Sequence, residues 1–177
     1  MIIKKTKFEG LLIVQQKNNV DERGILRETF NNKILKKKFV FEYCTTSKSN
    51  VFRGFHFQTK KKQSKFVNVL KGKILDVVID LRKNSRTFGK VFKIILSKNN
   101  AIGLFIPAGF AHAYYSYDKE NIIYYKLDNY YAPKFESGII YNDPLLKIKW
   151  PKNKMMVSKK DKKLLTISQF KKKIKYL

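Results

Sequence analysis

The segment Val51-Phe52-Arg53-Gly54-Phe55-His56-Phe57-Gln58 predicts a β-strand that carries one of the two histidines of the chain. Aromatic and β-branched residues are typical of strands. Histidine is the side chain whose ordinary pKa lies nearest neutrality, so in a pocket it is a natural proton acceptor, and an arginine beside it could hold an anion. A histidine in an apolar strand is more often a core residue. This segment alone therefore leaves a catalytic and a structural role open.

Further runs of strand length, separated by turn residues, lie on both sides of this segment. We expect strands at residues 10–16, 25–30, 65–70, 73–81, 91–96, 101–106 and 121–127. The turn residues at Lys71-Gly72 and at Ser97-Lys98-Asn99-Asn100 predict two hairpins. Many short antiparallel strands predict an all-β sandwich or barrel, and a histidine strand at the centre favours a double-sheet jelly roll with an internal pocket.

The alternation along the strands indicates which side chains face this pocket. Lys65 and Asp76 each share a face of their strand with apolar residues, and polar residues on an apolar inward face mark a site. Arg53 and His56 are three residues apart and would point to opposite faces of a regular strand. If both line the pocket, the strand must contain a β-bulge, for which Gly54 is the suitable residue.

Length and composition predict one domain over residues 1–177, because no Pro/Gly/Ser-rich linker divides the chain. No apolar run approaches the ~20 residues of a membrane helix, and Leu11-Leu12-Ile13-Val14 is too short for a signal-peptide core. A single cysteine, Cys44, excludes an intramolecular disulfide framework and fits a reducing compartment. We therefore expect a soluble cytoplasmic protein without membrane insertion.

The net charge of +26 would also suit a nucleic-acid-binding protein. The lysines are spread along the chain, however, and only five of the 39 basic residues are arginines, the residue favoured for gripping phosphate. We expect a solvated basic surface that attracts an anionic substrate, and no nucleic-acid partner.

The residue pattern changes near the C-terminus. Ser158-Lys159-Lys160-Asp161 matches a capping box ahead of Leu164 and Leu165, so we expect a short helical segment from about residue 158. One or two helical turns are also expected within residues 31–38. Short helices would thus flank the sheets.

Ordered motifs extend from about residue 5 to about residue 161. They are Asp21-Glu22-Arg23-Gly24, Arg53–Gln58, Gln63-Ser64-Lys65, Asp76–Arg82, Ile106–His112, Tyr124-Tyr125-Lys126, Asn129–Pro133, Asn142-Asp143-Pro144 and Trp150-Pro151. In this order they resemble the dTDP-4-dehydrorhamnose 3,5-epimerase family. The resemblance implies a cupin fold, which is a double-stranded β-helix or jelly roll, in a homodimer whose N-terminal strands cross to the partner. It also implies that C3 and C5 of dTDP-4-dehydro-6-deoxy-D-glucose are inverted, giving dTDP-4-dehydro-L-rhamnose.

Many cupins hold a metal ion through several histidines and a carboxylate. With His56 and His112 as the only histidines, a three-histidine site cannot be assembled. We therefore expect acid–base chemistry without a metal or other cofactor.

Removing a proton beside a ketone needs a base, a partner for the enolate oxygen and an acid on the opposite face. The resemblance implies that His56 is the base, that Asp161 orients it, that Lys65 holds the enolate and that Tyr125 returns the proton. Each residue also has a structural alternative. Asp161 could belong only to the capping box, Lys65 could be a solvated lysine, and Tyr125 could be a sheet aromatic.

The resemblance implies eight substrate-binding residues as well. Arg23 and Arg53 would hold the diphosphate, and Tyr130 and Tyr131 would stack on the thymine ring. The remaining four would contact the nucleotide or the sugar: Glu28, His112, Glu136 and Lys160.

One departure from the family pattern concerns Tyr43-Cys44-Thr45, which stands where the family has a Gln-x-Asn segment that contacts the nucleotide. The preference for thymine is therefore open. So is the number of carbons inverted, because a single-carbon epimerase or a ketoisomerase of another nucleotide-linked deoxysugar would use the same base and acid. A non-catalytic sugar-binding cupin and a basic nucleic-acid-binding protein are the alternatives from other classes.

Overall fold

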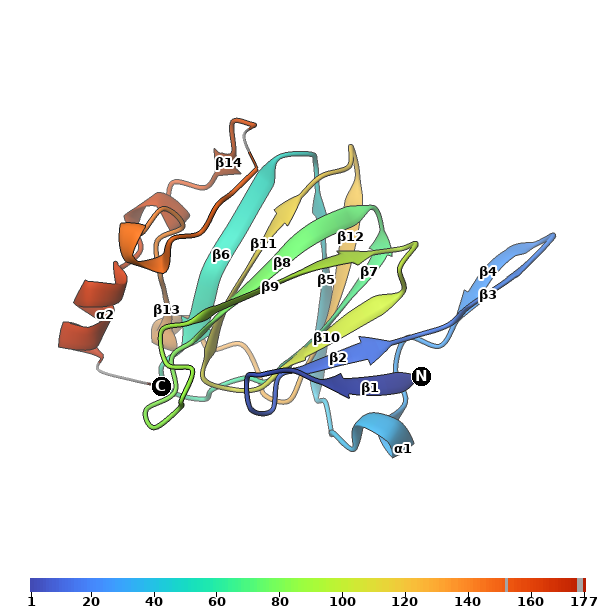
Figure 1. Ribbon diagram of the computed structural model, residues 1–177, viewed down its shortest axis with the longest axis horizontal. Helices are drawn as coiled ribbons and strands as arrows, with labels where there is room; N and C mark the ends of the chain where they lie inside the picture. The colour runs from blue at the N-terminus through green and yellow to red at the C-terminus, as the bar shows by residue number, and fades with distance from the viewer. Residues whose placement is uncertain (152, 175–176) are drawn as a thin grey trace.

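Two β-sheets packed face to face form the body of the molecule (Figure 1). The first sheet has the order β1 (Ile2–Lys5), β2 (Leu12–Gln15), β10 (Ile102–Ile106), β7 (Lys65–Lys71), β12 (Asn121–Leu127) and β5 (Phe41–Ser47). The second has the order β13 (Glu136–Gly138), β6 (Val51–Gln58), β11 (Phe110–Ser116), β8 (Lys73–Asp80) and β9 (Val91–Ser97), and β14 (Met156–Val157) pairs with β6. This computed structural model describes residues 1–151, 153–174 and 177. The predicted all-β jelly roll is confirmed.

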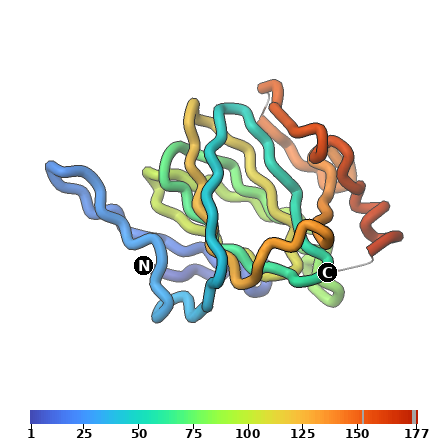
Figure 2. Tube along the Cα trace, turned by 180° about the vertical axis from the view of Figure 1, so that it is seen from behind, coloured from blue at the N-terminus to red at the C-terminus, as the bar shows by residue number. Residues whose placement is uncertain are grey.

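The remaining elements lie at the edges of this body. A hairpin of β3 (Asn18–Asp21) and β4 (Gly24–Arg27) projects away from both sheets (Figures 1 and 2). The helices are short: α1 (Asn32–Leu35), η1 (Pro133–Phe135), η2 (Pro144–Leu146), η3 (Asp161–Lys163) and α2 (Ile167–Lys173). None of the helices in the described residues is long and apolar enough to cross a membrane.

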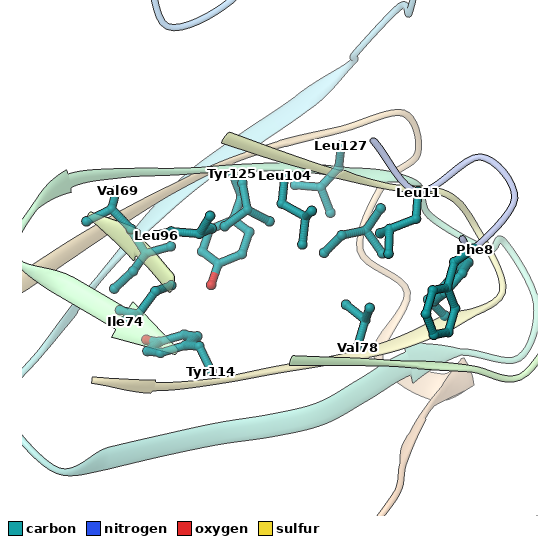
Figure 3. Packing of buried hydrophobic residues seen from close by; sticks show 14 residues of the cluster. Phe8, Leu11, Val69, Ile74, Val78, Leu96, Leu104, Tyr114, Tyr125 and Leu127 are labelled. Carbon is teal, nitrogen blue, oxygen red and sulfur yellow. The ribbon is translucent and has the colours of Figure 1, made fainter. Parts of the chain in front are cut away.

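The main core lies between the inner faces of the two sheets. Tyr125 and Leu104 of the first sheet point toward Tyr114 and Val78 of the second (Figure 3). Alternation along each strand places these side chains on the inner faces. The two polar residues expected on inward faces agree with this arrangement, because Lys65 lines the pocket and Asp76 is fully buried.

The two predicted hairpins are wrong, although their strands exist. β7 pairs with β10 and β12 in the first sheet, whereas β8 pairs with β11 and β9 in the second. Likewise, β9 belongs to the second sheet and β10 to the first. Both turns carry the chain from one sheet to the other, so that apolar side chains such as Val69 and Ile74 meet across the core. A tight turn specifies a reversal of the chain, but burial decides whether the two strands pair or stack.

The C-terminal segment covers the outer face of the second sheet (Figure 1). Ser158 Oγ accepts a hydrogen bond from the Asp161 backbone N at 3.0 Å, but only the single turn η3 follows. The α-helix begins later, at Ile167, where Thr166 and Gln169 form a reciprocal capping box. The helix starts later because the backbone of Leu164 is extended and ends the first turn.

Because α2 packs against the sheet through Phe170, shortening this side chain should cause a large loss of stability. Phe170 is fully buried, and its ring meets the Phe57 ring edge-on at 5.6 Å. Phe170→Ala should lower the free energy of unfolding by about 3–5 kcal/mol, because it leaves a cavity under the helix. Denaturant titration measures this loss. Lys172→Ala, at an exposed position of the same helix, is the control and should change stability by less than about 0.5 kcal/mol.

Candidate active site

A pocket enters the sandwich between the two sheets. Its larger part, of about 530 Å³, is lined by side chains of both sheets and of the C-terminal segment, and a smaller neighbouring part of about 350 Å³ extends toward η1 and β13. Three residues line both parts: Tyr43, His56 and Lys65. The four predicted catalytic residues all line the larger part, although they come from positions up to 105 residues apart.

His56 and Asp161 form a hydrogen-bonded pair at this pocket. His56 Nε2 lies 2.8 Å from Asp161 Oδ1, and the Gly54 backbone N donates to Asp161 Oδ2 at 3.3 Å. Burial opposes ionisation of Asp161, but the hydrogen bond and charge of His56, together with the bonds from Gly54 and Ser158, lower its pKa. A carboxylate in this position orients the imidazole and stabilises the imidazolium that forms when His56 accepts a proton.

A β-bulge in β6 brings Arg53 and His56 to the same pocket, as predicted. His56 lies opposite His112 of β11, whereas Arg53 lies opposite Tyr114, so β6 uses one residue more than its partner over this interval. Gly54 has φ +131°, and a Cβ at this position would lie 2.4 Å from Ala113 Cβ. Only glycine satisfies both the conformation and the close approach.

Lys65 reaches the pocket from the start of β7. Burial lowers its pKa to about 8, against the opposing effect of the negative charges of Glu136 and Asp76. An ammonium group in a partly dry site interacts strongly with a developing oxyanion. Lys65 is therefore suited to hold an enolate.

Tyr125 lies on the opposite sheet from His56, so the phenol and the imidazole face the pocket from its two walls. Burial raises the pKa of Tyr125 well above its ordinary value, and the negative charge of Asp76 acts in the same direction. Tyr125 is thus protonated at neutral pH and can donate a proton. This arrangement offers a base on one wall and an acid on the other.

A second histidine–carboxylate pair lies beside the first. His112 Nε2 is 2.8 Å from Asp76 Oδ2, and both residues are buried. The Asp76 Oδ1 atom has no hydrogen-bond partner among the described residues. The sequence placed Asp76 on the inward face of an apolar strand, at the start of one of the family motifs, but assigned it no role in the site.

Arg53 is held along the pocket wall by β5. Its Nε donates to Ser47 Oγ at 3.1 Å, and Ser47 Oγ lies 2.8 Å from the Tyr114 hydroxyl. Thr45 Oγ1 contacts the same hydroxyl at 3.0 Å. Ser47 and Tyr114 fix the arginine but carried no recognisable signal in the sequence.

Glu136 connects two further predicted residues, Tyr131 in the smaller part of the pocket and Lys160 in the larger part. Its Oε2 accepts hydrogen bonds from the Tyr131 hydroxyl at 2.6 Å and from Lys160 Nζ at 2.5 Å. Burial opposes ionisation of Glu136, but these two bonds and the charge of His56 lower its pKa. A hydrogen-bonded group of three predicted residues therefore lines the pocket: Tyr131, Glu136 and Lys160.

Three predicted binding residues lie outside this pocket in the single chain. Arg23 is on the projecting hairpin, where its side chain is 83% exposed and pairs with Asp21. Glu28 follows the hairpin and accepts a hydrogen bond from Asn31. Tyr130 is 62% exposed beside Phe41. Within one chain, these three residues do not join the others.

The metal-ligating side chains do not cluster in the part of the chain that the structure describes. No group of three or more His, Cys, Asp or Glu residues there is placed to hold a metal ion. The two His–Asp pairs use their imidazole Nε2 atoms in hydrogen bonds to carboxylates. The groups gathered at the pocket are suited to proton transfer.

Comparison with known sequences identifies the family of this chain. The sequence model of the dTDP-4-dehydrorhamnose 3,5-epimerase family matches residues 5–169. The dTDP-4-dehydrorhamnose 3,5-epimerase of Methanothermobacter thermautotrophicus is 40% identical over 166 residues, which cover 89% of this chain and 90% of that protein. The Escherichia coli protein of the same name is 35% identical over 177 residues, covering 96% of each.

Solved structures agree with the sequences. The dTDP-6-deoxy-D-glucose-3,5-epimerase from Legionella pneumophila, in complex with dTDP-4-keto-L-rhamnose, has a TM-score of 0.92 at 34% identity and covers 98% of this chain and 96% of that one. The dTDP-4-dehydrorhamnose 3,5-epimerase from Bacillus anthracis, with TDP and PPi bound, has a TM-score of 0.89 at 35% identity, covering 94% and 99%. Fold, pocket and sequence thus agree, and the chain belongs to the dTDP-4-dehydrorhamnose 3,5-epimerase family.

Proposed function

We propose that this protein inverts C3 and C5 of dTDP-4-dehydro-6-deoxy-D-glucose and releases dTDP-4-dehydro-L-rhamnose. The observation that carries the proposal is the placement of His56 and Tyr125 on opposite walls of one pocket, with Lys65 between the two parts of that pocket. An inversion needs a base and an acid on opposite faces of the same carbon. The relative from Legionella pneumophila was solved with the expected product, which supports this substrate class.

The proposed reaction at each carbon has two proton transfers. His56 removes the proton beside the C4 ketone, the electron pair of the broken C–H bond forms a C=C bond to C4, and the π electron pair of the C=O bond moves to the ketone oxygen. The Lys65 ammonium stabilises the resulting enolate. Tyr125 then donates a proton to the opposite face of the carbon, and solvent restores the protonation states of both residues. A second cycle at the other carbon completes the double inversion.

The substrate-binding roles follow from the same pocket. We assign Arg53 to the diphosphate, because its guanidinium is held on the wall by Ser47. His112 and Lys160 face the larger part, and Glu136 and Tyr131 face the smaller part, which we assign to the nucleotide. Asp161 and Lys160 both come from the C-terminal segment. We therefore propose that residues 1–177 act as one domain, in the reducing cytoplasm that the lone Cys44 suits.

The projecting hairpin supports a homodimer. Val20 and Leu26 on it are 71% and 75% exposed, and an isolated two-stranded hairpin is marginally stable in water. We propose that each hairpin docks on the partner, which would bring Arg23 and Glu28 to a pocket that also has Tyr130 at its edge. Light scattering should give twice the chain mass. A monomer at assay concentration contradicts this arrangement.

The charge of Lys65 predicts how activity depends on pH. Burial favours the neutral amine, so the protonated fraction of Lys65 decreases as the pH rises through about 8. Since only the ammonium form stabilises the enolate, kcat/KM should decrease above this pH and approach a tenfold loss per pH unit. Lys65→Arg remains charged and should lose this alkaline limb, although its rate is lower. An unchanged alkaline limb in Lys65→Arg would assign the titration to another group.

The function is tested by incubating the purified protein with dTDP-4-dehydro-6-deoxyglucose in deuterated water. NMR should detect deuterium at both C3 and C5, together with the L-rhamno product. Label at a single carbon would establish the single-carbon alternative. No label, under conditions in which the Escherichia coli relative labels fully, would refute the proposed activity.

A further inference from the structure

Tyr43 occupies the junction between the two parts of the pocket. It lines both parts and lies directly opposite Tyr125 in the register of β5 and β12. The two rings stack at a centroid distance of 4.7 Å with an interplanar angle of 19°. Tyr125 also meets the His112 ring edge-on at 6.1 Å. Two aromatic neighbours therefore restrict the ring that faces His56 across the pocket.

The hydroxyl of Tyr43 differs from those of Tyr114 and Tyr131. The Tyr114 hydroxyl contacts Ser47, and the Tyr131 hydroxyl donates to Glu136. The Tyr43 hydroxyl has no hydrogen-bond partner among the described residues. Desolvation in the pocket raises the pKa of Tyr43 to about 12, and the negative charge of Glu136 contributes. At neutral pH this hydroxyl is thus a protonated donor that is free to bind a ligand.

We propose that Tyr43 is a positioning residue for Tyr125 and a substrate-binding residue at the sugar–diphosphate linkage. The proposal rests on the proposed function, in which Tyr125 is the acid. The stacked ring keeps the Tyr125 phenol aimed at the sugar in the larger part. Because Tyr43 lines both parts of the pocket, its free hydroxyl donates a hydrogen bond to an oxygen of the linkage between them.

Removing the Tyr43 ring and removing only its hydroxyl should have different effects on the reaction. Without the ring, Tyr125 gains rotational freedom and delivers its proton less often. His56 can still remove a proton and return a deuteron to the same face. The ratio of solvent exchange to inversion should therefore increase, which a loss of general stability would not cause. Without the hydroxyl alone, substrate binding weakens while proton delivery remains.

The experiment compares Tyr43→Phe and Tyr43→Leu with a control, Tyr124→Leu. Tyr124 is the neighbour of Tyr125 on the opposite face of β12. Its hydroxyl donates a hydrogen bond to Glu42 outside the pocket. Measured quantities are kcat, KM and the exchange-to-inversion ratio in deuterated water, with thermal unfolding for each variant.

Tyr43→Leu should lower kcat about tenfold or more and raise the ratio. Tyr43→Phe should raise KM by roughly 3- to 10-fold, as expected for one lost hydrogen bond, with kcat and the ratio unchanged. The Tyr124→Leu control should match the wild type in kcat, KM and the exchange-to-inversion ratio.

Each contrary result has a separate meaning. A wild-type ratio and kcat in Tyr43→Leu would refute the positioning role, and a wild-type KM in Tyr43→Phe would refute the hydrogen bond. If Tyr43→Leu does not fold, Tyr43→Gln, which also lacks the ring, replaces it, and a wild-type ratio and kcat in that variant refute the positioning role. A raised ratio in Tyr43→Phe, which keeps the ring, contradicts that role as well. A wild-type enzyme that neither exchanges nor inverts the substrate refutes the proposed function itself, before any variant is compared.

Discussion

His56→Ala should abolish hydrogen exchange at C3 and C5 and lower kcat by about 10²–10⁴-fold, the range for loss of a general base. No other imidazole can replace it, because His112, the second histidine, is buried and bonded to Asp76. Without a base, neither enolate forms, so both exchange and inversion are lost together. NMR in deuterated water, with the substrate in excess over KM, measures both.

A second variant tests Asp161, the carboxylate partner of His56. Asp161→Asn keeps the shape of the site but cannot stabilise an imidazolium, so it should also reduce kcat strongly while substrate binding persists. Thermal unfolding of both variants should remain cooperative. Retention of full exchange by His56→Ala would remove His56 from the mechanism.

Tyr125→Phe should separate exchange from inversion. The variant keeps the ring that stacks on Tyr43, but it lacks the proton that must reach the face opposite His56. We expect inversion to fall by about 10²–10⁴-fold, as for loss of a general acid. Exchange should persist, because His56 can return a deuteron to the face from which it removed the proton. The recovered substrate would then carry deuterium with its original configuration.

The same NMR experiment tests the assignment directly. Label with retained configuration in Tyr125→Phe supports Tyr125 as the acid, since no other side chain then serves the opposite face. Wild-type inversion by this variant would show that a different group delivers the proton. Tyr124→Phe, one residue away on the outer face, is the matched control and should behave as the wild type.

The strands and their inward residues could be read from the sequence because both depend on local alternation. The bulge at Gly54 was also predictable, since the three-residue spacing of Arg53 and His56 cannot serve one pocket without it. The pairing of strands was not. The turns at residues 71–72 and 97–100 look like hairpin turns, but the strands on either side of each turn belong to different sheets.

The proposed catalytic residues could be named through the resemblance of motifs, whereas the contacts that support them could not. Asp76 carries no motif that marks it as the partner of His112, and Ser47 carries none that marks it as the support of Arg53. Arg23 matched a motif, yet in one chain it lies on the projecting hairpin away from the pocket. Such contacts join residues far apart in the chain, so local pattern does not encode them.

By itself, the sequence determined the all-β class, the inward faces, the glycine bulge and the family. The tertiary structure alone decided which strands pair, where the C-terminal helix begins, and that Asp161 reaches His56. The physical reason is that alternation, turn conformation and steric limits act over a few residues. Sheet pairing and the His56–Asp161 contact depend on burying apolar surface from distant segments, such as Phe170 against Phe57. That burial lays the C-terminal segment over the second sheet and thereby brings Asp161 to the pocket.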